Sequence, residues 1–315
     1  MDGYNTCEIN MTMTESKKNE IIETARKNGL DLEVQLFPKN NTTKEGFVIK
    51  TDSGANPILY ADSFPAEMSV ANIVSHMMDT LKNLDSEKAE VSRILEMAKS
   101  GEIEPSSLKR RVACVNGNEK WLESMPHRKL PGTDLALYYA IKWKEYMEIP
   151  VNTGIASLLD WTEEDMYLFT KNEEYMYSDI GNILLGSGKY KPVANVTNIG
   201  YKSLFVLTNT DKCHGASALS RTDVLRKLAE GFDGKNLIIL PSSVHEVLII
   251  PDYPGIEPET NNVEALAQMV SEVNLNEVAT EDKLSDSVYR YLYTEDKIEL
   301  IAGSAYVDEE VASYE

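Results

Sequence analysis

Hydrophobic residues recur at helical spacing or alternate with polar ones along most of the chain. Residues 14–28 lie between a Thr14 cap and a Gly29 stop, a pattern that predicts a helix. Residues 32–38 and 46–52 alternate apolar and polar side chains on either side of a polar connection, which predicts a β-hairpin. Residues 57–62 predict a third strand beside it.

The clearest helical pattern begins after Ser69. Its apolar positions share one face and exclude His76, which we expect on the solvent side. A separate helix is predicted over 87–99, and the polar stretch 99–111, with Gly101 and Pro105, predicts a linker. The apolar face comprises Val70, Ile73, Val74, Met77, Met78, Leu81 and Leu84.

The second half predicts further alternation of strands and helices. A short strand near Val112 and a small helix over 118–124 come first, and the extended runs 133–143 and 151–158 are expected to pair. Thr162 and Asp165 fit a capping box at the start of a helix. Strands are predicted at 204–209, 215–220, 237–240, 247–250, 285–291 and 297–303, with helices from Thr222 and over 262–273.

This order joins strands in pairs through short links, which indicates antiparallel hairpins and an α+β fold with mixed, mainly antiparallel sheets and flanking helices. We expect a disordered leader over residues 1–13, an N-terminal α+β domain over 14–105, a C-terminal α+β domain over 106–307 and an acidic tail over 308–315. Residues 173–200 give no clear pattern.

Composition favours a soluble, cytoplasmic protein. The chain has 315 residues, 42% of them hydrophobic, and no run as long as the roughly 18 apolar residues of a membrane helix. The N-terminus lacks a basic region followed by an apolar run, so we expect no signal peptide. Three dispersed cysteines, Cys7, Cys114 and Cys213, argue against a disulfide framework or a zinc finger.

Charge is the strongest compositional feature. The chain carries 31 Lys and Arg against 51 Asp and Glu, a net charge of -20. Such a balance disfavours direct contact with nucleic acid phosphates and with anionic membranes. It leaves two interpretations, namely general solubility or an acidic face that docks onto a basic protein partner.

The segment LIILPSSVHEVLIIP places polar side chains between two apolar runs. Ser242, Ser243, His245 and Glu246 are the residues with chemistry to offer. If they lie on a strand, Ser243 and His245 share a face but stand about 6–7 Å apart, whereas His245 and Glu246 point to opposite faces. A serine–histidine relay needs an approach of about 3 Å, so we expect no relay within this segment.

Other candidate sites are weaker. Cys213 and His214 are expected in an exposed turn, where adjacent side chains diverge. The stretch LLGSGKYKP lacks a phosphate-loop pattern, because Ile183 replaces the first glycine and Tyr190 replaces the Ser or Thr. The four histidines show no metal-binding spacing, so we predict no metal and no cofactor. The neighbouring aromatics Tyr138, Tyr139, Trp143 and Tyr146 are expected to pack in the core.

Several segments resemble a family of uncharacterised bacterial proteins that share a domain of unknown function, common in Clostridia and their mobile elements. LPSSVHEV and LSDSVYRY are the most specific, and the resemblance departs in the leader, in residues 173–200 and at Cys213–His214. It supports the fold and suggests anaerobic Firmicutes, their phages or conjugative elements as the source, but it brings no activity, cofactor or catalytic residue. The remaining matching segments are DLALYYAI, LFVLTN, HGASAL, VLRKLAEGF, VSEVNLNEVATEDKLSDSVYRY and NPILYADSF.

We therefore expect a non-catalytic, acidic protein-binding or regulatory protein of a mobile element or its host. One version is an anti-defence inhibitor that presents carboxylates to the basic groove of a nuclease. The alternative is a hydrolase with a site around Ser243, His245 and Ser285 or Asp286. The expected binding residues are Ser242, Ser243, His245, Glu246, Asn274, Ser285 and Asp286.

Overall fold

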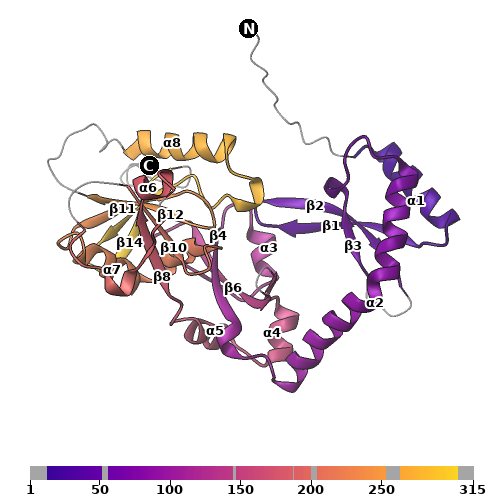
Figure 1. The fold of residues 1–315 in the computed structure, drawn as a ribbon, viewed down its shortest axis with the longest axis horizontal. Coiled ribbons are helices and arrows are strands. Elements are labelled where there is room, and N and C mark those ends of the chain that lie inside the picture. Colours follow the sequence, from indigo (N-terminus) through magenta and orange to yellow (C-terminus); the bar gives the residue numbers. More distant parts are fainter. Residues whose placement is uncertain are drawn as a thin grey trace, which may run out of the picture. The chain divides into compact units, whose positions relative to one another are not determined.

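A computed structural model describes residues 13–51, 56–144, 147–186, 188–199, 204–252 and 263–303. Most of the expected leader, the expected tail and Tyr146 lie outside these residues. Contacts divide the chain into two compact units, Met1–Ser100 and Gly101–Glu315, here called unit 1 and unit 2. Each unit is described by itself, with the element labels of Figure 1.

Unit 1 joins a three-stranded antiparallel sheet to two helices. The predicted first helix is confirmed, with Thr14 as its cap and Gly29 at φ 80° just beyond its end. The predicted hairpin is also confirmed, although its connection is only Asn40–Asn41, because residues 42–45 extend the second strand. The elements are α1 (Glu15–Lys27), β1 (Leu32–Lys39), β2 (Thr42–Ile49), β3 (Ile58–Tyr60) and α2 (Val70–Ser100).

The predicted break inside α2 is wrong. One helix runs through 31 residues from Val70 to Ser100 and includes the separately predicted segment 87–99. No glycine or proline stands between Leu84 and Glu87 to end the first segment. His76 is exposed, as expected, and its ring meets the edge of Phe64.

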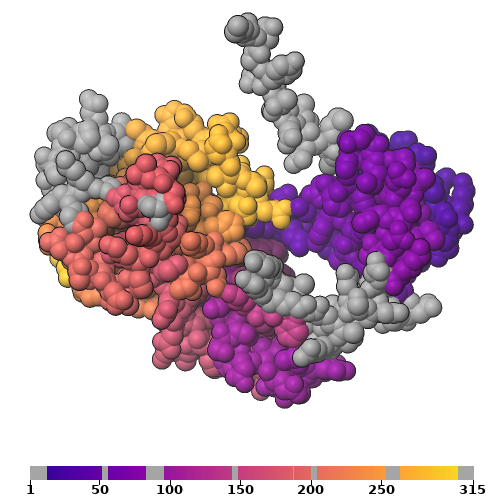
Figure 2. Space-filling view, in the orientation of Figure 1, coloured from indigo at the N-terminus to yellow at the C-terminus, as the bar shows by residue number. Residues whose placement is uncertain are grey.

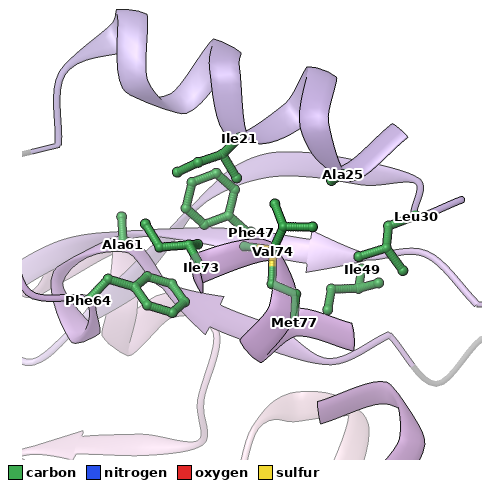
Figure 3. Close-up of a cluster of buried hydrophobic side chains, with 10 residues drawn as sticks. All are labelled: Ile21, Ala25, Leu30, Phe47, Ile49, Ala61, Phe64, Ile73, Val74 and Met77. Atoms are coloured by element: carbon green, nitrogen blue, oxygen red, sulfur yellow. The ribbon is translucent and has the colours of Figure 1, made fainter. Parts of the chain in front are cut away.

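A single apolar cluster holds unit 1 together (Figure 3). Ile21 of α1 points toward Phe47 of β2, and Ile73 and Met77 of α2 complete the packing around them. All four side chains are at most 1% exposed. Burial of this size stabilises a fold by about 1.5–3 kcal/mol per large side chain.

Unit 2 contains two antiparallel sheets. The smaller has the order β4-β6-β5, with β7 also paired to β6, and Tyr138 and Tyr139 on β6 are buried as predicted. The predicted linker is wrong at its end, because residues 108–111 belong to β4. Its strands are β4 (Leu108–Cys114), β5 (His127–Lys129), β6 (Leu135–Lys144) and β7 (Met147–Pro150), followed along the chain by the helices α4 (Thr153–Leu159) and α5 (Glu163–Phe169), with α3 (Glu119–Glu123) between β4 and β5.

The larger sheet has seven strands in the order β14-β13-β11-β12-β10-β8-β9. Its helix α8 packs Leu266 and Val270 against Ile238 and Leu240 of the central strand β11. The α+β class with antiparallel sheets is therefore confirmed. The elements are β8 (Tyr175–Asp179), α6 (Ile180–Leu184), β9 (Lys191–Pro192), β10 (Phe205–Asn209), α7 (Thr222–Glu230), β11 (Asn236–Pro241), β12 (Val247–Asp252), α8 (Val263–Asn276), β13 (Val288–Leu292) and β14 (Lys297–Ala302).

Two predicted strands of unit 2 are helical. Residues 151–158 contribute to α4, because the Asn152 side chain accepts a hydrogen bond from the Ile155 amide and caps the helix. Residues 215–220 form a 3-10 helix that follows His214 in the left-handed conformation, with φ 53°. In both segments a local backbone feature outweighs the apolar pattern. The capping box of Thr162 and Asp165 is confirmed.

Candidate functional site

The connection between β11 and β12 carries the polar residues Ser242, Ser243, His245 and Glu246. It is a turn between two predicted strands that are both confirmed, so the alternation of faces considered for a strand does not apply to these four residues. The Ser243 hydroxyl accepts the hydrogen bond of the His245 amide at 3.0 Å, and the Ser243 amide donates to the Glu246 carbonyl at 3.3 Å. A serine side chain thus satisfies a backbone group that a strand would have paired.

Both ring nitrogens of His245 have partners. Nδ1 accepts the hydrogen bond of the His214 amide at 3.2 Å. Nε2 lies 3.4 Å from Asp282 Oδ1, so in the neutral ring the proton belongs on Nε2. The Ser243 hydroxyl meets the His245 backbone instead of its ring, and no nitrogen of the ring is left to act as its base.

His214 is brought to His245 by an unusually close backbone approach. Gly215 follows it, and a Cβ there would stand 2.2 Å from Thr208 Oγ1 and 2.7 Å from the His245 carbonyl oxygen. The Gly215 amide donates to that carbonyl at 2.9 Å. The two imidazole centroids are consequently 5.3 Å apart, and we call His214 and His245 the histidine pair.

The His214 ring lies in a poorly solvated position. Its Nδ1 is buried and has no hydrogen-bond partner in the part of the chain that the structure describes. Burial, and then the positive charge of Arg111, lower the pKa of His214 from 6.5 to about 4. The imidazole is therefore neutral at physiological pH.

A buried ion-pair network includes Arg111, whose charge acts on His214. Arg111 on β4 is 1% exposed and binds Glu148 through Nε at 2.8 Å and through a second guanidinium nitrogen. The same guanidinium lies 3.7 Å from Glu173, and Glu173 also accepts from Asn209 at 3.2 Å. Asn209 in turn binds the backbone of Cys213, which fixes the turn before His214. Burial raises the pKa of the Cys213 thiol, so the thiol is not activated.

Ser285 belongs to a second cluster, centred on Asp134. This carboxylate accepts hydrogen bonds from Ser285 at 2.8 Å, Ser287 at 2.9 Å and the buried Tyr289 hydroxyl. The Cys114 thiol also points to it, at 3.7 Å, and burial followed by the Asp134 charge raises the pKa of that thiol to about 12. The cluster joins the loop before β6 to the segment before β13.

Asn274 and Asp286 pair with each other. Asn274 on α8 donates to Asp286 Oδ1 at 2.8 Å and to the Ser285 carbonyl at 3.0 Å. Asp286 is thus committed to α8, while His245 faces Asp282. The structure brings Ser243, His245 and Glu246 into one turn, and Asn274, Ser285 and Asp286 into another group.

Sequence reasoning missed Asp282 and Asp134, and it considered His214 only together with Cys213. These two adjacent side chains were expected to diverge from each other in an exposed turn, and the approach of His214 to His245 through a left-handed backbone and Gly215 was not predicted. Asp282 lies 37 positions after His245 and Asp134 lies 151 positions before Ser285, so no local spacing shows either contact. A histidine followed by glycine in a turn was the only local signal.

The described residues offer little for a metal or a membrane. Among the residues that the structure describes, no group of three or more His, Cys, Asp or Glu side chains is arranged to hold a metal ion. No helix among these residues has the length and apolar character needed to cross a bilayer. A shallow cavity of about 330 Å³ is lined by Arg290, Glu299 and the apolar Val263, Leu300 and Ile301, and includes none of the predicted site residues.

Comparison with known proteins gives one match. No curated protein and no solved structure is significantly similar to the chain. A family model described as a family of unknown function, DUF5688, matches residues 12–292, which is most of the chain and includes both units in large part. The chain belongs to this family of unknown function, DUF5688.

Proposed function

We propose that this chain is a non-catalytic, cytoplasmic binding protein that presents carboxylates to a basic protein partner. In this proposal it serves a mobile element, a phage or their bacterial host. One form of the partner is a nucleic-acid-binding protein such as a defence nuclease, whose basic groove the chain would occupy.

The observation that supports the proposal is that the arginines of unit 2 are paired within the chain. Residues 101–315 contain 20 Lys and Arg against 35 Asp and Glu. All six arginines of this part are paired with groups of the same chain, so each guanidinium is already engaged by a carboxylate, a hydroxyl or a carbonyl and is less available to bind phosphate. Their partners are Thr170 and the Tyr167 carbonyl for Arg110, Glu148 for Arg111, Glu163 and Glu164 for Arg128, Asp223 for Arg221, Asp296 for Arg226 and Asp252 for Arg290.

Asp282 lies beside the histidine pair, and further carboxylates are its neighbours along the chain. The Val244 amide donates to the Asp282 carbonyl at 2.8 Å, which holds the β11–β12 turn against the acidic segment that follows α8. Glu277 and Glu281 are exposed, and the Asp282 side chain is 46% exposed. We call Glu246, Glu277, Glu281 and Asp282 the acidic rim. Lysine and arginine side chains of a partner are the natural complement of such a rim.

A hydrolase centred on Ser243 and His245 finds no support in this geometry. The imidazole already accepts one hydrogen bond and faces Asp282 with its other nitrogen. Asp286, the expected third member, is bound to Asn274. Catalysis would require these three contacts to be exchanged together, so we propose binding instead.

Capture of a partner from the native host tests the proposal. The immobilised full chain should retain a protein of basic surface, and its affinity, measured by calorimetry with the purified partner, should fall at least about tenfold between about 0.05 M and 0.5 M salt. An affinity that does not depend on salt would contradict the proposal. Capture of no partner, together with turnover of an ester or phosphate, would favour the hydrolase.

Charge reversal locates the surface. Glu277→Lys combined with Glu281→Lys should lower the affinity for the partner at least about tenfold, because it reverses the charge of two of the four carboxylates in the acidic rim. Glu20→Lys combined with Glu23→Lys, two exposed positions of α1, changes net charge equally and should alter affinity less than about threefold. Equal losses in both variants would show that net charge, and not the rim, determines binding.

A further inference from the structure

Two leucines at the end of α6 are exposed to an unusual degree. Leu184, the last residue of α6, is 79% exposed, and Leu185, which follows it, is 85% exposed. Lys189 lies between α6 and β9, Lys191 is the first residue of β9, and both lysines are exposed as well. We call these four residues the leucine loop. It combines apolar surface with positive charge in a unit that is otherwise strongly acidic.

The leucine loop is held in place at both ends. Asp179 caps α6 by accepting the Gly181 amide at 2.7 Å, and the Gly188 amide donates to the Asn182 carbonyl at 3.1 Å. The Ser178 hydroxyl binds the Lys189 carbonyl at 3.1 Å, and Lys191 pairs with Tyr177 of β8. Hydrogen bonds therefore hold the described backbone before and after the two leucines, which lowers the entropy cost of using them in a contact.

A surface of complementary character lies on α8, whose golden atoms reach the surface in Figure 2. Met269 is 48% exposed and Val273, one turn later, is 42% exposed. Beside them, Gln268 donates to Glu272 at 3.0 Å, so a carboxylate borders the apolar pair. We call Gln268, Met269, Glu272 and Val273 the α8 flank.

We propose that the leucine loop of one copy of this chain docks on the α8 flank of a second copy. Leu184 and Leu185 would cover Met269 and Val273, while Lys189 and Lys191 would face Glu272. Apolar area and opposite charge then coincide in one contact. The α8 flank of this same chain offers both the exposed apolar side chains and the carboxylate that the leucine loop would contact, which favours a second copy as the occupant.

The two surfaces differ, so the contact is heterologous. An open assembly therefore has a free leucine loop at one end and a free α8 flank at the other. It can grow into a longer chain, or the two ends can bind each other and close a ring. This property gives the proposal a specific test, independent of whether the acidic rim binds a basic partner.

Sedimentation velocity on the full chain supplies that test. Between about 1 and 100 µM at about 0.15 M salt, the average mass should rise above the 35.3 kDa of one chain. Leu184→Ser combined with Leu185→Ser should stay monomeric, and so should Met269→Ser combined with Val273→Ser. A 1:1 mixture of these two variants should form a species of twice the monomer mass, because each supplies the surface that the other lacks. Leu36→Ser, at a 67% exposed leucine of β1, should associate like the unaltered chain.

Charge exchange provides a second measurement. Lys189→Glu with Lys191→Glu, and Gln268→Lys with Glu272→Lys, should each lower self-association at least about tenfold, whereas their mixture should recover it. An unaltered chain that remains monomeric up to about 100 µM would overturn the proposal. Association that survives the leucine substitutions would overturn it as well.

Discussion

Unit 1 and unit 2 are stabilised in different ways. Unit 1 depends mainly on one apolar cluster of ten buried side chains, and it also buries the charged Lys18, which pairs with Glu15 and Glu45. Unit 2 also buries apolar residues, but it adds a charged network at Arg111 and a carboxylate cluster at Asp134. Apolar packing tolerates changes of pH and salt, whereas buried charges depend on every partner being present and correctly ionised.

The difference can be measured separately in the two units. All three tryptophans, Trp121, Trp143 and Trp161, belong to unit 2. Tryptophan fluorescence therefore reports the unfolding of unit 2 alone, while far-ultraviolet circular dichroism reports both units.

The largest expected effect is in unit 1. Phe47 is 1% exposed at the centre of the apolar cluster, so Phe47→Ala should lower the free energy of unfolding of unit 1 by about 3–5 kcal/mol. Urea titration should show an earlier transition in circular dichroism, with little change in tryptophan fluorescence. The exposed Leu36→Ala should cost less than about 0.5 kcal/mol. Coincident shifts of both signals would show that the units unfold together.

A comparable loss of stability is expected in unit 2 when a buried charged residue is replaced. Arg111→Met removes the cation that binds Glu148 and faces Glu173, and should cost about 3 kcal/mol in the fluorescence transition. Lys142→Met breaks the more exposed pair with Asp211 and should cost about 1 kcal/mol or less. Equal losses of unfolding free energy in the two variants would show that the buried network stabilises unit 2 no more than the exposed ion pair does.

The third effect concerns pH and reaches the size of the second only near pH 4. The pKa of an unfolded histidine is near 6.5, whereas burial keeps the pKa of His214 at about 4 in the folded chain. Between these values the unfolded state binds more protons, so the free energy of unfolding falls as pH drops from about 6.5 to 4, by up to about 3 kcal/mol. His214→Asn, which tolerates the left-handed backbone, should flatten this dependence in the fluorescence transition.

An exposed histidine provides the control for that experiment. His127→Asn on β5 changes an exposed side chain of unit 2, the unit that tryptophan fluorescence reports, so the pH dependence should remain as it is in the unaltered chain. An unchanged slope in His214→Asn would refute the assignment of the acid sensitivity to this residue.

Local features explain which elements the sequence predicted. The Thr14 cap, the Thr162–Asp165 capping box and the hairpin of β1 and β2 each depend on residues close in sequence, and each is confirmed. Residues 151–158 and 215–220 carry apolar side chains that suit strands, but an Asn152 cap and a left-handed His214 make them helical. The pattern of apolar residues alone does not reveal such backbone constraints.

The candidate site was less accessible to prediction. Ser243, His245 and Glu246 do share one turn, but the partners that decide their chemistry, His214 and Asp282, come from other segments. The expected alternation of side chains along a strand also failed, because the Ser243 hydroxyl captures a backbone amide. Contacts of this kind form only in the tertiary fold, and the periodic pattern of apolar and polar residues in the sequence does not reveal them.

The Asp134 cluster has a consequence for biosynthesis. Its carboxylate finds its hydroxyl donors at Ser285, Ser287 and Tyr289, up to 155 positions later in the chain. Translation must therefore pass residue 289 before all three hydroxyl groups can reach this carboxylate, so water solvates Asp134 in the growing chain until then. A chain that ends before residue 285 would leave Asp134 without these three donors.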